Sequence, residues 1–153
     1  MKIIIARIKK DAPQIHGLYS EWVNEKVSPK TLPITIEELR NQMKKSTVFL
    51  AKEKNELMGF LICKIKKSAE NTNMYHLKKG ETYAELDSMY IKKNHRKKGL
   101  GKALINACKT ELKKHGHKKI IVFADSIKPR ELMGFYEKNG FKTLFVSMIS
   151  ELK

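Results

Sequence analysis

Residues 96–102 have the sequence RKKGLGK and join a predicted strand, residues 81–91, to a predicted amphipathic helix. The first turn of a helix has backbone N–H groups without intrahelical partners and carries partial positive charge, so a phosphate group can accept several hydrogen bonds there. Gly99 and Gly101 allow the backbone to approach such a ligand closely. Four of the seven residues are cationic. This stretch therefore predicts a phosphate-binding turn.

The spacing excludes two common phosphate loops, because no GxxxxGK[ST] string occurs and Leu104 stands where GxGxxG needs its last glycine. The pattern Arg-x-x-Gly-x-Gly instead resembles the pyrophosphate loop of the GNAT N-acetyltransferase family, whose ligand is acetyl-CoA. The resemblance implies that the whole turn binds this cosubstrate, with contacts from Arg96, Lys97, Lys98, Gly99, Leu100, Gly101 and Lys102.

The order of the predicted elements agrees with this resemblance along the whole chain. Apolar and β-branched patterns predict strands at residues 2–8, 47–53, 57–65, 81–91, 120–124 and 141–149. Helices are predicted to start at Asp11 as a cap, at the capping box formed by Thr35 and Glu38, at Leu100 and at Pro129. The order βααβββαβαβ implies an α/β (α+β) GNAT fold, with a mixed central sheet of about six to seven strands and about four helices.

Length and composition predict one folded domain over residues 1–153. Hydrophobic residues make up 41% of the chain, yet no apolar run approaches the ~20 residues of a membrane span. The apolar run near the N-terminus is too short for a signal-peptide core, so we expect a cytoplasmic protein without membrane association. The two cysteines and five histidines lack metal-site spacing, and no metal is expected.

The net charge of +16 would attract CoA phosphates, nucleic acid or an acidic protein. A proteome biased toward lysine, or the surface of a thermophilic protein, would give the same charge without any such partner. The charge alone therefore identifies no partner.

Two carboxylates near the predicted turn are candidates for base catalysis. Glu85 and Asp87 stand two residues apart, so an extended strand places both on one face, where either could accept a proton from an amine directly or through water. The GNAT resemblance favours Glu85, because relatives often carry a glutamate eleven residues before the first residue of the loop, and Asp87 could then orient the acceptor amine. Alternatively, both are solvated carboxylates that balance nearby lysines.

Tyr136 is the candidate acid for the departing CoA thiolate. It lies in residues 135–141, FYEKNGF, which resemble the last GNAT signature, where the tyrosine points toward the thioester sulfur. Alternatively, Tyr136 packs on the sheet beside Phe135 and Phe141.

The resemblance also places the cofactor arm along the fourth strand, like an added strand. By position, the backbone of Met89 and Ile91, which flank Tyr90, would pair with this arm, and an N–H near Met89 would polarise the thioester carbonyl. Relatives commonly carry an asparagine where this chain has Pro129. That contact is missing here unless Asp125, Ser126 or Arg130 replaces it.

These features together predict an acetyl-CoA-dependent N-acetyltransferase that transfers the acetyl group directly to a primary amine. Cys63 and Cys108 lie outside the predicted site, which disfavours a covalent enzyme intermediate. The acceptor stays open, although residues 17–40 and 68–82 are expected to form its pocket, and a homodimer through residues 141–149 is possible. Two alternatives are a CoA-binding sensor with weak chemistry and a basic module that binds nucleic acid or acidic proteins; the enzyme itself would not require nucleic acid.

Overall fold

The computed structural model describes residues 1–29 and 31–151. Its sheet has five strands, in the spatial order β1-β2-β3-β4-β5. These strands are β1 (Lys2–Ile5), β2 (Thr47–Glu53), β3 (Glu56–Lys67), β4 (Thr82–Ile91) and β5 (Ile120–Val122). Neighbouring strands from β1 to β4 are antiparallel, whereas β5 runs parallel to β4, so the sheet is mixed as predicted.

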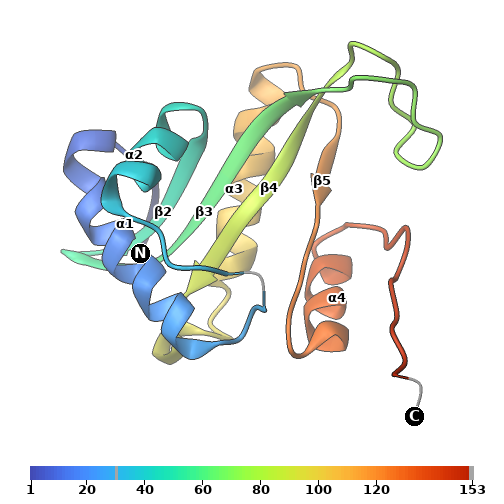
Figure 1. Cartoon of the computed structure of the whole chain (residues 1–153). Coiled ribbons are helices and arrows are strands. Elements are labelled where there is room, and N and C mark those ends of the chain that lie inside the picture. The colour runs from blue at the N-terminus through green and yellow to red at the C-terminus, as the bar shows by residue number, and fades with distance from the viewer. Residues whose placement is uncertain (30, 152–153) are drawn as a thin grey trace.

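Four α-helices and one 3₁₀ helix surround this sheet. They are α1 (Ile8–Glu25), α2 (Ile36–Lys44), η1 (Lys93–His95), α3 (Leu100–Lys114) and α4 (Pro129–Lys138). Figure 1 shows α1 and α2 in front of the sheet, α3 behind it, and α4 beyond β5. No helix in the described part of the chain is both long enough and apolar enough to cross a membrane.

The sheet separates two hydrophobic cores. In β3, Phe60 and Ile62 belong to the first core, together with residues of α1 and α2, while Leu61 and Cys63 belong to the second, together with residues of α3. Successive side chains of a strand point to opposite faces, so β3 is apolar on both faces only along the part that the helices cover. Beyond that part, Lys64 and Lys66 continue the first face as polar residues.

Helix α1 begins at Ile8, three residues before the predicted start. The predicted cap is wrong, because the N-cap of α1 is Arg7; Asp11 lies inside the first turn, and its carboxylate accepts a hydrogen bond of 2.7 Å from the N–H of Arg7. Nζ of Lys52 donates to the same carboxylate at 2.7 Å. Burial opposes ionisation of Asp11, but Lys52 and the N–H of Arg7 hold the pKa of this carboxyl below its usual value. The predicted capping box of α2, Thr35 with Glu38, is confirmed.

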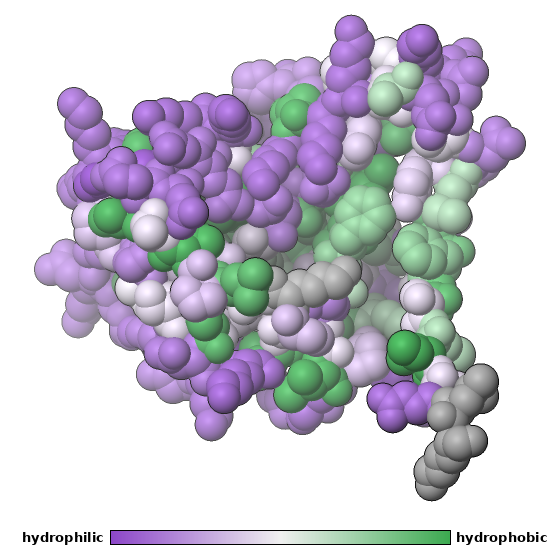
Figure 2. All heavy atoms as spheres, viewed as in Figure 1, coloured by the Kyte–Doolittle hydropathy of each residue, from purple (hydrophilic) through white to green (hydrophobic). Residues whose placement is uncertain are grey.

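The predicted count of six to seven strands is wrong, and so is the predicted strand at residues 141–149. The chain after α4 forms no strand within the described residues, so the element order differs from the prediction at its last element. Strand-forming residue types are not sufficient without a partner strand, and this segment runs past α4 instead of pairing with β5. Beyond Phe141, its large hydrophobic side chains therefore stay exposed, and Figure 2 shows green residues on this side of the molecule.

Strands β4 and β5 are paired only at one end. Their register covers Ala84–Leu86 of β4 and Ile120–Val122 of β5. Just beyond this pairing β4 has a bulge, because Leu86 lies opposite Cys63 and Ser88 lies opposite Ile62, so Asp87 is the extra residue. Figure 1 shows the chain after β5 diverging from β4 below this point. The second half of β4 therefore has an open edge.

Gly101, in the first turn of α3, marks a close approach of α3 to α4. A Cβ atom on Gly101 would lie 2.9 Å from Cζ of Phe135, which is closer than side chains tolerate. Phe135 packs against the second core and edge-to-face with Tyr136, with ring centroids 5.2 Å apart. The glycine thus allows Phe135 of α4 to pack against the start of α3.

We expect Gly101→Ala to destabilise the protein by about 1 to 3 kcal/mol, because the added methyl group must displace Phe135. Gly17→Ala is the matched control: Gly17 lies inside α1 with no atom within 4 Å of an added Cβ. This control should gain about 1 kcal/mol from helix propensity. Urea unfolding followed by circular dichroism measures both free energies. A Gly101→Ala variant as stable as the wild type would contradict the close approach.

Candidate active site

The turn before α3 has an unusual backbone conformation. Lys97 has φ of 59° and Gly99 has φ of 81°, both in the left-handed region. Gly99 is also the N-cap of α3, and its carbonyl accepts the N–H of Ala103 at 3.0 Å. Left-handed backbone is costly for lysine but not for glycine. Such strain tends to persist where a functional geometry requires it.

The electrostatics of this turn suit an anion. The first turn of α3 contains no acidic residue, although acidic residues are the usual partners of a helix N-terminus. Instead, Lys97 and Lys98 precede this turn in the sequence and Lys102 lies within it. The positive end of the helix and these lysines repel one another, and a bound phosphate would relieve both.

The open edge of β4 leads to this turn. The N–H of Lys92 donates to the carbonyl of Met58 on β3 at 2.9 Å. Backbone groups alternate along a strand, so those of Ile91 and Met89 point to the other edge, where β5 no longer pairs. Nε of Arg96 donates to the Ile91 carbonyl at 2.9 Å, which leaves the Ile91 N–H together with the Met89 N–H and carbonyl facing the opening.

Tyr90 is placed differently from its neighbours in the predicted cofactor strand. Its side chain is buried in the first core, where it stacks on Trp22 with ring centroids 5.9 Å apart. Its carbonyl faces β3, because it would lie 2.8 Å from a Cβ added to Gly59. The structure therefore keeps Tyr90 away from the open edge.

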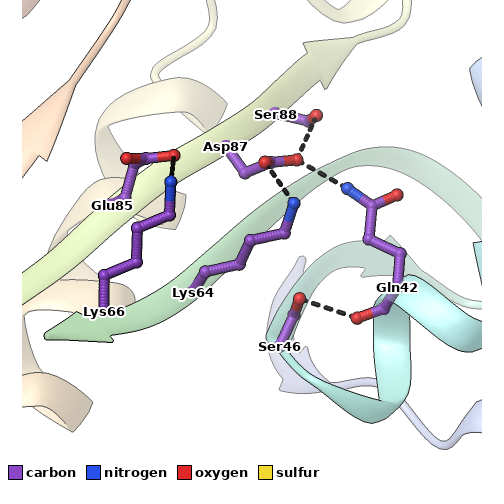
Figure 3. A network of polar contacts seen from close by, with 7 residues as sticks. All are labelled: Gln42, Ser46, Lys64, Lys66, Glu85, Asp87 and Ser88. Atoms are coloured by element: carbon purple, nitrogen blue, oxygen red, sulfur yellow. Dashed lines mark hydrogen bonds and ion pairs between the residues drawn. The ribbon is translucent and has the colours of Figure 1, made fainter.

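Glu85 and Asp87 each form an ion pair with a lysine of β3 (Figure 3). Nζ of Lys66 lies 2.8 Å from Glu85, and Lys64 bonds to Oδ1 of Asp87. The other oxygen of Asp87 accepts hydrogen bonds from Nε2 of Gln42 at 2.6 Å and from Oγ of Ser88 at 3.0 Å. Both carboxylates are thus fixed, and the lysines neutralise their charge.

Lys64, Lys66 and Gln42 were not predicted as neighbours of the two carboxylates, because they come from other elements of the fold. Lys64 lies directly across from Glu85 in the antiparallel register, but the two are distant in sequence. Gln42 reaches Asp87 from α2, 45 positions away. Alternating lysines at the end of an apolar strand were the available signal, but each lysine pairs with a diagonal neighbour on β4 and not with the residue directly opposite.

Tyr136 lies on the other face of the sheet. It packs against the second core and contacts Phe141 edge-to-face, with ring centroids 5.3 Å apart. Burial raises the pKa of Tyr136 to about 12, so its hydroxyl is neutral at physiological pH. Tyr136 also lines a cavity of about 180 Å³ between β5 and the start of the C-terminal segment.

The connection from β5 to α4 also has defined partners. Pro129 occupies the first turn of α4, and Oγ of Ser126 accepts the N–H of Lys128 at 3.0 Å. Asp125 accepts a hydrogen bond of 2.6 Å from Oγ of Ser28, in the loop after α1. This contact joins the α1–α2 loop to the β5–α4 connection. Within residues 1–29 and 31–151, no group of three or more histidine, cysteine or acidic residues is arranged to hold a metal ion.

Solved structures of similar fold span nearly the whole chain. A ribosomal-protein-alanine N-acetyltransferase from Brucella melitensis biovar Abortus 2308 is 18% identical, with a TM-score of 0.71 and 99% of both chains covered. The aminoglycoside 6'-N-acetyltransferase AAC(6')-Ih from Acinetobacter baumannii is 13% identical, with a TM-score of 0.73 and coverage of 99% of this chain and 97% of that one.

An aminoglycoside acetyltransferase, meta-AAC0020, from an uncultured soil metagenomic sample is 23% identical, with a TM-score of 0.70 and coverage of 99% and 96%. At these identities the likeness shows the fold alone. The comparison with curated proteins gives no match. The family comparison is more specific, because residues 13–141 match the acetyltransferase (GNAT) family. The chain therefore belongs to the GNAT acetyltransferase family.

Proposed function

We propose that this protein transfers an acetyl group from acetyl-CoA directly to a primary amine. One observation carries the proposal: the open edge of β4 at Met89 leads to the cationic, left-handed turn at Lys97 and Gly99. An extended, amide-containing arm that ends in a pyrophosphate fits both parts at once. The arm would pair with the strand edge, and the pyrophosphate would accept N–H groups at the start of α3.

In this proposal acetyl-CoA supplies the acetyl thioester, and the chain orients it between the two faces of the sheet. The Met89 N–H is the candidate donor to the thioester carbonyl, because it faces the opening. Asp87 and Glu85, fixed by Lys64 and Lys66, approach from the face of α2 and hold the acceptor amine or a water that takes its proton.

Tyr136 approaches from the face of α3. Its pKa of about 12 lies above the reference pKa of a thiol, about 8.5. The hydroxyl therefore stabilises a departing thiolate mainly by donating a hydrogen bond, and a complete proton transfer is not required.

Tyr136→Phe is expected to lower kcat about 10- to 100-fold while the Kd for CoA stays within about twofold, because it removes one hydrogen bond to a developing charge. Thiol release from acetyl-CoA in the presence of an amine measures kcat, and calorimetry measures the Kd. Tyr75→Phe is the matched control, since Tyr75 lines the same cavity and has no part in the proposed chemistry. Equal kcat values for Tyr136→Phe and wild type would remove Tyr136 from the mechanism.

The charges around the carboxylates favour an acceptor with a single ammonium group. Glu85 and Asp87 are already neutralised by Lys66 and Lys64. In α2, Glu37 pairs with Arg40 at 2.5 Å, and Glu38 belongs to the capping box. A polycation would therefore have few carboxylates to bind here, and Lys64 and Lys66 would repel it.

One similar structure is an enzyme named for an alanine of a ribosomal protein, and another is named for aminoglycosides, which carry several amines. We favour the α-amine of a peptide for this chain. Its reference pKa, about 7.7 to 8.0, leaves a useful neutral fraction at pH 7, whereas an alkyl ammonium near 10.4 needs a stronger base. Carboxylates held by lysines are better suited to orient such an amine than to deprotonate a polyamine.

Lys64→Met should change this preference, because it removes the cation bound to Asp87 and frees the carboxylate for an ammonium group. We expect kcat/KM for spermidine to rise at least about tenfold relative to kcat/KM for a short peptide with a free N-terminus. Lys67→Met, one position beyond the paired lysines, is the charge-matched control. Wild-type enzyme that prefers spermidine to the peptide would contradict the proposed acceptor class.

A further inference from the structure

Glu25, the last residue of α1, contacts Tyr90 of β4 and Arg96, the first residue of the phosphate-binding turn. Its carboxylate accepts hydrogen bonds from the Tyr90 hydroxyl and from Nη2 of Arg96, the latter at 2.6 Å. Glu25 and Arg96 are 71 positions apart, so no local sequence pattern indicates the pair. The contact joins the end of a helix on the first face to the first residue of the turn.

Three groups fix the guanidinium of Arg96. Besides the bond to Glu25, Nε donates to the Ile91 carbonyl at 2.9 Å, and the guanidinium carbon lies 5.4 Å from the centre of the Tyr90 ring. A guanidinium is planar, and its donors point in fixed directions. Bonds to a carboxylate and a carbonyl, together with the aromatic ring, therefore determine both its position and its orientation.

The ionisation states strengthen this arrangement. Burial opposes ionisation of Glu25, but the hydrogen bonds from Tyr90 and Arg96 hold the pKa of this carboxyl below its usual value. Burial, followed by the bond to Glu25, raises the pKa of Tyr90. At neutral pH the cluster therefore consists of a carboxylate, a guanidinium and a neutral phenol, which is the combination its hydrogen bonds require.

We propose that Glu25 is a positioning residue for the cosubstrate site, and that it acts by anchoring Arg96. In this arrangement Arg96 fixes the start of the turn, and Lys97 and Gly99 present the groups that meet the pyrophosphate. The anchor has a clear physical purpose, because the left-handed Lys97 follows Arg96 directly and a strained turn needs rigid support. The inference rests on the proposed function, since it assigns a part in acetyl-CoA binding.

Glu25 also ends the helix that leads into the predicted acceptor region. Glu25 ends α1, and the chain then continues into the loop whose Ser28 bonds to Asp125 beyond β5. This loop lies within residues 17–40, which are expected to form part of the acceptor pocket.

The test is calorimetric titration of CoA into the full-length protein at constant salt. Glu25→Gln should weaken CoA binding about tenfold, because it removes the charge from the bond to Arg96. Glu21→Gln is the matched control, since Glu21 lies one turn earlier on α1 and its ion pair with Lys92 is long, at 4.0 Å. It should bind CoA like the wild type. Thermal unfolding of each variant shows that it is folded at the titration temperature.

The Arg96→Lys variant distinguishes two roles of Arg96, anchoring of the turn and direct binding of phosphate. Lysine keeps the positive charge but cannot reach Glu25 and the Ile91 carbonyl together, so an anchoring role predicts the same tenfold loss. The double variant Glu25→Gln, Arg96→Lys should lose no more affinity than Arg96→Lys alone, because both substitutions act on the same contact between Glu25 and Arg96.

Two results would overturn the anchor while leaving the proposed function intact. These are wild-type affinity in Glu25→Gln, and full affinity in Arg96→Lys, which would mark Arg96 as a point charge for phosphate. A wild-type protein that does not bind CoA would overturn the proposed function itself, and the positioning role with it.

Discussion

The separation of β4 from β5 is the constraint on which the rest of the structure depends. Leu86 is the last residue of β4 that pairs with β5, and β4 continues from there to Ile91. Backbone groups on this edge of β4 therefore have no partner strand, which is costly unless they find another partner. The bulge at Asp87 bends the strand at that point and changes which residues face each edge. Met89 consequently presents its backbone to an opening instead of to β5.

The same separation explains why the proposed catalytic groups come from opposite faces of the sheet. Asp87 is held against α2 by Gln42, whereas Tyr136 belongs to the core under α3. In a continuous sheet these side chains would be isolated from each other by the backbone. In the proposed function, the open edge between them allows one extended ligand to meet both, and the turn at Lys97 and Gly99 binds its anionic end.

The sequence predicted the features that depend on local chemistry. The capping box of α2 and the turn before α3 are specified by neighbouring residues, and both are where the pattern placed them. Contacts between distant segments were not predictable in this way. The bond between Glu25 and Arg96, like the ion pair between Lys64 and Asp87, depends on register and helix placement.

The C-terminal segment is a case in which local residue types predicted an element that the structure lacks. Residues 141–149 have strand-forming side chains, but a strand also needs a partner edge, and this segment leaves α4 in a direction that does not bring it alongside β5. Gly101 is a second example of a contact between distant segments. From the sequence, we expected this glycine to allow close approach of a phosphate, whereas the structure shows that Phe135 lies beside it.

Thermal unfolding with and without acetyl-CoA tests the central claim most directly. The informative comparison is between Gly99→Glu and Gly116→Glu, because these glycines stand at opposite ends of α3, both have φ near 80°, and neither has an atom within 4 Å of an added Cβ. At 100 times its Kd, acetyl-CoA should stabilise the wild type and Gly116→Glu by about 2.7 kcal/mol, and Gly99→Glu hardly at all. Equal stabilisation of both variants, or none in the wild type, would contradict the cosubstrate site at the end of β4.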